Sequence, residues 1–159
     1  SQGGYVGGSR DLCEFLRHEA RGFIYSGAPA PSAAGAALEG IRILRNETWR
    51  FRELDRKSQL FRARLKENGL DVGQSTTAIV PVILGTELLA FEVARRCHEL
   101  GIFVHAIIPP IVPPGTSRLR CSVMSCHDDA ELLAAADKIA EIVTSVSTEL
   151  ESGFFTAFR

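Results

Sequence analysis

Apolar residues recur at helical spacing close to the start of the chain. Leu12, Phe15 and Leu16 lie three and four residues apart, which predicts a helix over residues 11–19. The glycine-rich stretch 3–9 precedes it and predicts a short strand whose glycines allow close backbone contacts.

Two longer helices are predicted next. Ser32 is expected to cap the first of them, which is rich in alanine, because a serine side chain accepts a hydrogen bond from the free N–H groups of a helix start. Gly69 is expected to end the second, because glycine readily adopts the left-handed conformation found after a helix. The apolar positions that define the two helices are Leu38, Ile41 and Leu44, and then Leu54, Phe61 and Leu65.

The second half of the chain alternates between strand and helix patterns. Strands are predicted over residues 78–84, 102–107 and 118–123. Pro81 cannot donate a backbone hydrogen bond, so its strand is expected at a sheet edge or at a bulge.

Two helices belong to this alternating half. Thr86 is expected to cap the first, which ends at Gly101, and Asp128 with Glu131 three residues later resembles a capping box for the second. Their apolar stripes are Leu89, Val93, Cys97 and Leu100, and then Leu132, Ala135, Ile139, Ile142 and Val146.

These elements predict an α+β fold, with a small antiparallel sheet covered by helices on one face. The first stretch of helices does not fit inside that unit. We therefore expect residues 1–45 to be the trailing edge of a larger domain with its connector, and residues 46–159 to be a small domain.

Composition excludes several classes of protein. The chain has 159 residues, is 45% hydrophobic and carries a formal net charge of -1, so nothing global indicates binding to nucleic acid or to an anionic membrane. No apolar run is long enough for a membrane span. The four cysteines lie within apolar patterns, which favours a reducing cytoplasm. The opening at Ser1, without a methionine, suggests a fragment.

The most distinctive stretch reads PPIVPPGTSRLRCSV, over residues 109–123. Strand alternation places Arg118, Arg120 and Ser122 on one face, and the apolar side chains between them on the other. A guanidinium fork suits a carboxylate or a phosphate. The alternative is two ordinary surface arginines, which the pattern alone favours. The rigid proline loop shifts the balance toward binding, because a guanidinium fork that is already positioned loses less conformational entropy when it binds an anion than a mobile one does.

Other candidate chemistry is weak. The glycine pairs of residues 3–8 lack the lysine and spacing of a phosphate-binding loop. His105 and His127 are possible acid–base groups, with helix capping as the alternative for His127. No metal site is expected, because the spacing of the candidate ligands fits no standard zinc pattern. Those ligands are Cys97, His98, Cys121, Cys126 and His127.

Three stretches together resemble the C-terminal part of the α-oxoamine synthases, from residue 1 to about residue 145. They are GGYVGGSRDL…FLRHEARGFIYS, AIVPVIL and GIFVHAIIPPIVPPGTSRLRCSVMSCHD. That family consists of biosynthetic, pyridoxal-phosphate-dependent acyltransferases with the aspartate-aminotransferase fold (fold type I). The resemblance implies a homodimer that condenses an amino acid with an acyl thioester to an α-amino ketone, in most cases releasing carbon dioxide.

The resemblance also implies roles for individual residues. Arg120 would hold the carboxylate of the amino acid, with Arg118 as a helper. Ile108 and Ile111 stand where the family commonly has arginine and threonine, near the acyl entry, which favours a fatty or polyketide-like acyl chain. Ser26 would contact the cofactor phosphate.

A further departure qualifies the implied function, and one short stretch indicates a branch of the family. The family's cofactor-binding lysine lies before the glycine pairs, and none of Lys57, Lys66 and Lys138 is in that context. No catalytic residue is therefore expected in this chain, which should be inactive alone. The stretch 119–122, LRCS, resembles the serine palmitoyltransferase branch.

Two other functions stay open. One is a non-catalytic α+β module for dimerisation or ligand binding, and the other is an aminotransferase of the same fold. The sequence does not decide between coenzyme A and a carrier protein as the thioester partner, nor does it name the amino acid.

Overall fold

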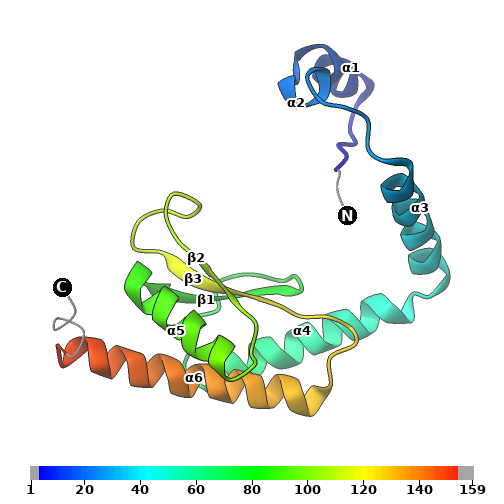
Figure 1. The fold of residues 1–159 in the computed structure, drawn as a ribbon. Helices are drawn as coiled ribbons and strands as arrows, with labels where there is room; N and C mark the ends of the chain where they lie inside the picture. Colours follow the sequence, from blue (N-terminus) through cyan, green and yellow to red (C-terminus); the bar gives the residue numbers. More distant parts are fainter. Residues whose placement is uncertain (1–3, 154–159) are drawn as a thin grey trace. The chain divides into compact units, whose positions relative to one another are not determined.

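A computed structural model describes residues 4–153 of the chain (Figure 1). The chain divides into two compact units, residues 1–48 and residues 49–159. The assignment of residues 1–45 to the end of a larger domain remains a prediction. The first unit contains α1 (Arg10–Glu19), α2 (Arg21–Ile24) and α3 (Pro31–Asn46).

The start of the first unit differs from the sequence expectation. Helix α1 begins after Ser9, whose Oγ accepts a hydrogen bond from the Leu12 N–H at 3.3 Å, and this confirms the predicted helix. The strand predicted for residues 3–9 is wrong within the described residues 4–9, which have no regular secondary structure. A strand needs a neighbour to pair with, and no strand is described in this unit.

Helix α3 confirms the second predicted helix but not its cap. It begins at Pro31, after Ala30, which makes no side-chain hydrogen bond to the helix. The fixed φ of proline suits the first helical position, so Ser32 lies inside the first turn instead of capping it. No residue of α1, α2 or α3 is buried.

The second unit is an α+β fold, as predicted. Its three strands form an antiparallel sheet with the order β1-β3-β2. Its elements are α4 (Trp49–Glu67), β1 (Ile79–Gly85), α5 (Glu87–Glu99), β2 (His105–Ile107), β3 (Ser117–Ser122) and α6 (Asp129–Glu151).

Strand β1 lies at an edge of the sheet, which confirms the prediction made from Pro81. Pro81 is opposite Arg120, and three residues further along each strand the N–H of Val123 donates to the Ala78 carbonyl. Backbone groups alternate in direction along a strand, so the missing N–H of Pro81 falls on the side away from β3. The N–H of Ile83 also faces that side and donates to the Asp71 carbonyl at 2.8 Å.

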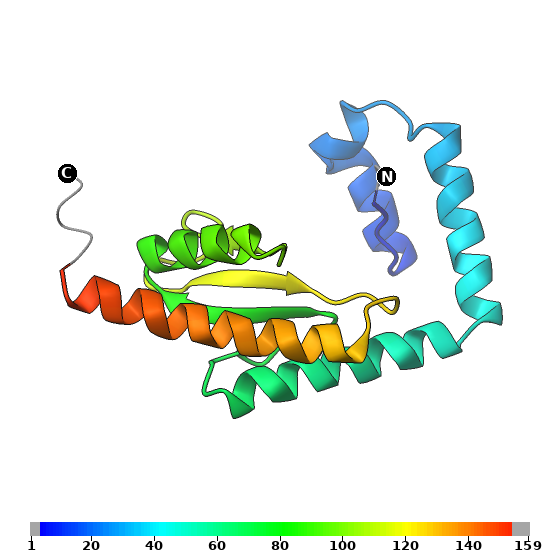
Figure 2. The same cartoon turned by 60° about the horizontal axis from the view of Figure 1, so that its bottom comes forward.

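The hydrophobic core lies between one face of the sheet and the three helices (Figure 2). Val80, Val82, Leu119 and Cys121, which alternate along β1 and β3, belong to this core. The alternation predicted for residues 118–123 is therefore confirmed. The core residues of the helices are Phe61 and Leu65 in α4, Val93, Ala94 and Cys97 in α5, and Leu132, Ala136, Ile139, Ile142 and Val146 in α6.

The caps predicted for α5 and α6 are confirmed, unlike the cap predicted for α3. Thr86 Oγ1 accepts a hydrogen bond from the Leu89 N–H, and Asp128 accepts from the N–H groups that follow it. Gly69 and Gly101 follow their helices with φ angles of 80° and 77°, a conformation that favours glycine.

Strand β2 is shorter than predicted, because the residues before it bind to α5. The N–H of Ile102 donates to the Cys97 carbonyl at 2.8 Å, and His98 Nε2 lies 2.6 Å from the Val104 carbonyl oxygen. Residues 102–104 therefore stay beside the end of α5, and pairing with β3 begins only at His105.

All four cysteines are free thiols. None of the helices described between residues 4 and 153 is both long enough and apolar enough to cross a membrane. The cytoplasmic location stays a prediction.

Candidate functional site

The sheet face opposite the helices carries the two predicted arginines. Arg118 pairs with Ile107 of β2 and Ile83 of β1, and Arg120 pairs with His105 of β2 and Pro81 of β1. Residues directly opposite each other in a sheet share a face. The arginines therefore have apolar neighbours on the β1 side, and an isoleucine and a histidine on the β2 side. The central strand β3 thus places both guanidinium groups in the middle of the open face.

A hollow of about 560 Å³ lies on this face. It brings together both arginines with Ile111 of the proline loop, whose side chain is 74% exposed. Ile108 does not line it. The lining contains no acidic residue, which leaves it positively charged. The residues are Ser75, Thr77, Ile79, Pro81, Ile107, Ile111, Arg118, Leu119 and Arg120.

The two arginines differ in how firmly they are held. Arg118 is half-buried, and its Nε donates to the Thr116 carbonyl at 3.0 Å. Arg120 is exposed. Within residues 4–153, neither guanidinium forms an ion pair with a carboxylate. Arg120 therefore keeps its whole fork available for an anion.

The proline loop is stiffened by its own hydrogen bonds. The Ile111 N–H donates to the Ile108 carbonyl at 3.0 Å, and Thr116 Oγ1 donates to the Pro113 carbonyl at 2.7 Å. The loop thus delivers β3 to the sheet in a defined direction, as the sequence predicts. It also places Ile111 at the hollow beside the arginines.

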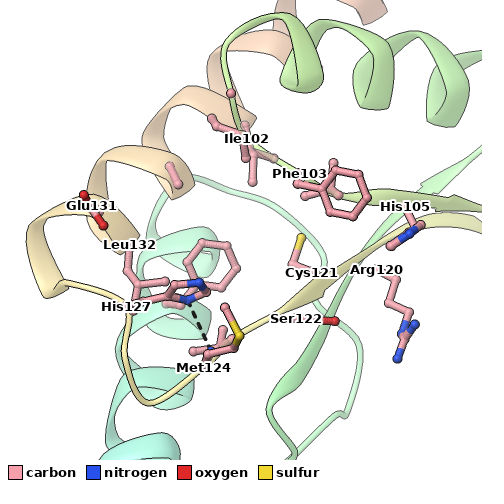
Figure 3. A pocket seen from close by; sticks show the side chains of 16 residues that line it. Ile102, Phe103, His105, Arg120, Cys121, Ser122, Met124, His127, Glu131 and Leu132 are labelled. Carbon is pink, nitrogen blue, oxygen red and sulfur yellow. Dashed lines mark hydrogen bonds between the residues drawn. The ribbon is translucent and has the colours of Figure 1, made fainter. Parts of the chain in front are cut away.

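A second hollow, of about 610 Å³, lies at the other end of β3 (Figure 3). It opens between residues 101–104, the end of β3 and the first turns of α6. His105, Cys121 and His127 line it, and Arg120 lines both hollows.

The remaining titratable candidates have structural roles. His127 Nδ1 accepts a hydrogen bond from the Met124 N–H of the preceding loop at 3.2 Å, whereas the cap of α6 is Asp128. Burial raises the pKa of Cys97 to about 11 and that of Cys121 to about 12, so both thiols stay protonated. No group of residues able to hold a metal occurs between positions 4 and 153.

Ser26 belongs to the first unit. Its Oγ donates to the Gly22 carbonyl at 2.5 Å, at the end of α2. Its predicted contact with a cofactor phosphate remains a prediction.

Neither hollow offers a lysine to attach the pyridoxal-phosphate cofactor that the resemblance implies. Lys57 is buried and donates to the carbonyls of Ser125 and His127, and Lys138 pairs with Glu141. That this chain lacks the family's cofactor-binding lysine stays a prediction.

One structural group was not found from the sequence. Lys57 of α4 holds the loop between β3 and α6, and it also pairs with Glu53 at 3.3 Å. Its partners are main-chain oxygens about 70 residues away, which leave no sequence signal. Likewise, Ser75 and Thr77 join the hollow only because the chain before β1 turns over the open face.

Comparison with known proteins identifies the family. The sequence profile described as aminotransferase class I and II matches residues 1–139. The chain belongs to the aminotransferase class I and II family. Aminotransferase-family relatives include the 8-amino-7-oxononanoate synthases of Thermoanaerobacter pseudethanolicus, 41% identical over 133 residues, and of Symbiobacterium thermophilum, 39% identical over 140 residues.

These alignments cover 84% and 88% of this chain, but 34% and 36% of the relatives. The chain spans about a third of the length of the curated relatives that it matches. Among solved structures, a serine palmitoyltransferase from S. paucimobilis with a bound PLP-myriocin aldimine superposes with a TM-score of 0.74 at 25% identity. That match covers 85% of this chain and 34% of the other.

These relatives confirm the resemblance to the α-oxoamine synthases within the aminotransferase family. The resemblance of the stretch 119–122 to the serine palmitoyltransferase branch stays a prediction, because relatives of both branches match the chain.

Proposed function

We propose that the chain is the C-terminal part of a pyridoxal-phosphate-dependent acyltransferase that condenses an amino acid with an acyl thioester to an α-amino ketone. The observation that carries this proposal is the open sheet face. There, Arg118 and Arg120 line a hollow without any acidic residue, in a chain of the aminotransferase class I and II family.

In this proposal Arg120 binds the carboxylate of the amino acid. Its exposed fork can donate two parallel hydrogen bonds, which fix the orientation of a carboxylate as well as its position. The bound cofactor would supply an electron sink for bond cleavage at the amino-acid Cα. The orientation of the amino acid decides which bond at Cα aligns with the cofactor and is cleaved. A carboxylate held on a rigid central strand fixes this orientation and so favours cleavage of one bond over the others.

Arg118 supports the same site from two residues away. Its Nε is engaged with the Thr116 carbonyl, which leaves its terminal nitrogens to strengthen the positive field of the hollow. The apolar groups next to both arginines, Ile107 and Ile111, exclude water from one side of the carboxylate. Ile111 therefore supports an apolar acyl partner, whereas Ile108 acts only through the shape of the loop.

The rest of the site comes from outside the second unit in this proposal. Ser26 contacts the cofactor phosphate, and a homodimer brings the two active sites together. The exposed apolar residues of the first unit, among them Phe15, Phe23 and Tyr25, suit burial against the remainder of the protein. The cofactor lysine also lies in that remainder.

The test is an assay of the full-length protein that contains this chain. It is mixed with pyridoxal phosphate, candidate amino acids and an acyl thioester, and free thiol and carbon dioxide are measured. We expect thiol release that depends on the amino acid. Arg120→Gln should lower this rate at least ~10-fold, because a charge-assisted pair is lost. The exposed Arg52→Gln in α4 is the matched control and should retain the rate.

Each other result identifies an alternative. Transfer of the amino group to a 2-oxo acid without thiol release indicates an aminotransferase. Binding of a carboxylate without turnover indicates a non-catalytic module. Thiol release that is equal in Arg120→Gln and in the unmodified protein contradicts the role given to Arg120.

A further inference from the structure

The open-face hollow, of about 560 Å³, has two unlike sides. On the β2 side, Ile107 and Ile111 of the proline loop line it. On the β1 side it is lined by Ser75 and Thr77, which both hydrogen-bond to the first residue of β1. Among the described residues of this lining, these two carry the hydroxyl groups. A ligand held by Arg120 therefore has apolar contacts on one side and hydroxyl groups on the other.

The segment that carries these hydroxyl groups, residues 71–78, is anchored at both ends. At its start, the Ile83 N–H of β1 donates to the Asp71 carbonyl at 2.8 Å. At its end, Nη2 of Arg62 in α4 donates to the Thr77 carbonyl at 2.7 Å. The segment is thus fixed against both β1 and α4. Its hydroxyl groups therefore hold a defined position at the rim of the hollow.

Thr77 has the hydroxyl group that is freer to bind a ligand. The proton of Ser75 Oγ is donated to the Ile79 carbonyl at 2.6 Å. Thr77 Oγ1 accepts from the Ile79 N–H at 3.2 Å, but its own acceptors, Ser75 Oγ and the Ile79 carbonyl, lie at 3.3 and 3.4 Å. Good hydrogen bonds from a hydroxyl group are about 2.5–3.0 Å long, so this proton is weakly held. Because Thr77 is exposed, its hydroxyl group can turn toward a ligand and donate or accept.

The charge of the hollow decides which polar group suits Thr77. Arg118 and Arg120 line the hollow, and its described lining contains no carboxylate, so an ammonium group on the ligand is repelled. A second carboxylate needs a second free fork, and Nε of Arg118 is engaged with the Thr116 carbonyl. A hydroxyl group carries no charge and can bond to Thr77 in either direction.

The geometry of the sheet suits a small ligand. Pro81 is directly opposite Arg120. Ile79, whose N–H binds Thr77, is two residues further along β1, roughly 7 Å away in a strand. The long side chain of Arg120 can extend over part of this span. The room that is left suits an amino acid with a short side chain.

We propose that Thr77 determines the specificity for the amino-acid substrate, by binding a hydroxyl group on Cβ while Arg120 holds the carboxylate. The proposal rests on the proposed function for the presence of an amino acid in the hollow. It predicts a preference for serine over alanine, which differ by this one hydroxyl group. The acyl partner keeps the opposite side of the hollow, which Ile111 lines.

The first test is a titration of the isotopically labelled 159-residue chain, followed by the amide resonances in NMR. The probes are 3-hydroxypropanoate and propanoate, which differ by one hydroxyl group and carry no ammonium group. We expect 3-hydroxypropanoate to shift the Thr77 amide and to bind at least ~3-fold more tightly, the effect of one hydrogen bond. Equal affinity of the two carboxylates would overturn the proposal.

Three substitutions locate the hydroxyl contact. Thr77→Val replaces the hydroxyl by a methyl group, and water can bind the Ile79 N–H at this exposed position, so the fold is kept. Thr76 is also exposed but does not line the hollow, so Thr76→Val is the matched control. We expect the preference for 3-hydroxypropanoate to disappear in Thr77→Val, to persist in Thr76→Val and to return in Thr77→Ser. The same preference in both valine variants would contradict the role of Thr77.

The second test uses the full-length protein and compares kcat/KM for serine and alanine, measured by thiol release. Thr77→Val should lower the serine-to-alanine ratio at least ~3-fold, and Thr76→Val should leave it unchanged. A higher kcat/KM for aspartate than for serine would assign this position to a carboxylate and overturn the proposal.

The two measurements separate this proposal from the proposed function. If the chain prefers 3-hydroxypropanoate through Thr77 but the full-length protein releases no thiol, the acyltransferase function alone is refuted. If the enzyme is active and its serine-to-alanine ratio is unchanged in Thr77→Val, the role of Thr77 alone is refuted.

Discussion

Arg64 of α4 binds Asp137 of α6 through two hydrogen bonds, from Nε to Oδ1 at 2.7 Å and from Nη2 to Oδ2 at 3.0 Å. Arg56 repeats this pair with Asp129, at 2.7 and 2.8 Å. Both pairs join residues that are 73 positions apart, so α4 and α6 run side by side in the same direction. Two bidentate pairs thus fix the register of α6 against α4.

Asp137→Asn should lower the melting temperature slightly, by ~1–3 °C. The substitution keeps the size of the side chain but removes its charge from Arg64, and partly exposed pairs contribute little. Glu141→Gln is the control, since Glu141 pairs with Lys138 of its own helix at the surface and not with another described element. Thermal unfolding followed by circular dichroism measures both. A larger loss in the control than in Asp137→Asn would contradict this role for the interhelical pair.

Acid should weaken the pairing of α5 with α6. Arg96 hydrogen-bonds Glu149 and lowers the pKa of this carboxyl from 4.5 to about 2. The folded state therefore binds this proton more weakly than the unfolded state. The stabilisation is complete above pH 4.5 and is lost as the pH falls toward about 2. Melting temperatures measured across this range should fall less steeply in Glu149→Gln, and parallel curves would contradict the assignment.

Lys57 should contribute more to stability than an ordinary surface lysine. Lys57→Met keeps most of the apolar stem but leaves the carbonyls of Ser125 and His127 without their donor. Buried acceptors without a donor cost ~1–3 kcal/mol in the free energy of unfolding. Lys66→Met, in the same helix but exposed, should cost less than ~0.5 kcal/mol. Urea unfolding compares the two variants. Equal losses in the free energy of unfolding would show that the hydrogen bonds from Lys57 to the loop do not add to stability.

The 159-residue chain alone should not bind pyridoxal phosphate covalently. Lys57 donates to carbonyls of the loop between β3 and α6, and Lys138 pairs with Glu141. No lysine lines either hollow. After mixing with the cofactor and reduction with borohydride, mass spectrometry should find no stoichiometric adduct. A single modified lysine at full occupancy would show that this chain carries its own attachment site.

Local signals in the sequence predicted most of the second unit. The alternation of residues 118–123 placed Arg120 on the open face, and Thr86 and Asp128 start their helices as expected. These features depend on nearest neighbours, which a sequence displays directly. Pro81 predicted an edge strand for the same reason. Every N–H of a central strand faces a neighbouring strand, so a proline, which has no N–H, is tolerated at the outer side of an edge strand.

Features that depend on distant partners were not predicted. The strand expected before residue 10 has no pairing partner among residues 4–48, and β2 loses residues 102–104 to hydrogen bonds with α5. The hollow of about 610 Å³ is lined by these residues and by the end of β3. Arg120, taken from the strand pattern, and Ile111, taken from the family resemblance, both line the open-face hollow, and their roles stay predictions. Ile108 does not line this hollow, and Ser75 and Thr77 had no signal in the sequence.

The last prediction asks whether Arg120 acts through its fork or only through its charge. Arg120→Lys keeps the charge but replaces two parallel donors by a single ammonium group, so it is not conservative at a bidentate site. In the full-length protein we expect amino-acid binding to weaken by roughly 10-fold, since part of a charge-assisted pair is lost. Arg118→Lys should weaken it much less, because Nε of Arg118 is already engaged with the Thr116 carbonyl.

The measurement is a titration of each variant with amino acids, followed by the absorbance of the bound cofactor. Cofactor content should be the same in both variants, because neither arginine is proposed to hold the cofactor. Equal weakening in Arg118→Lys and Arg120→Lys would mean that the carboxylate lies between the two residues. If neither change weakens binding, the carboxylate lies elsewhere and the open face has another role. Weaker amino-acid binding in Arg120→Lys alone supports a guanidinium fork held on the central strand. Such a fork fixes both the position and the orientation of the bound carboxylate.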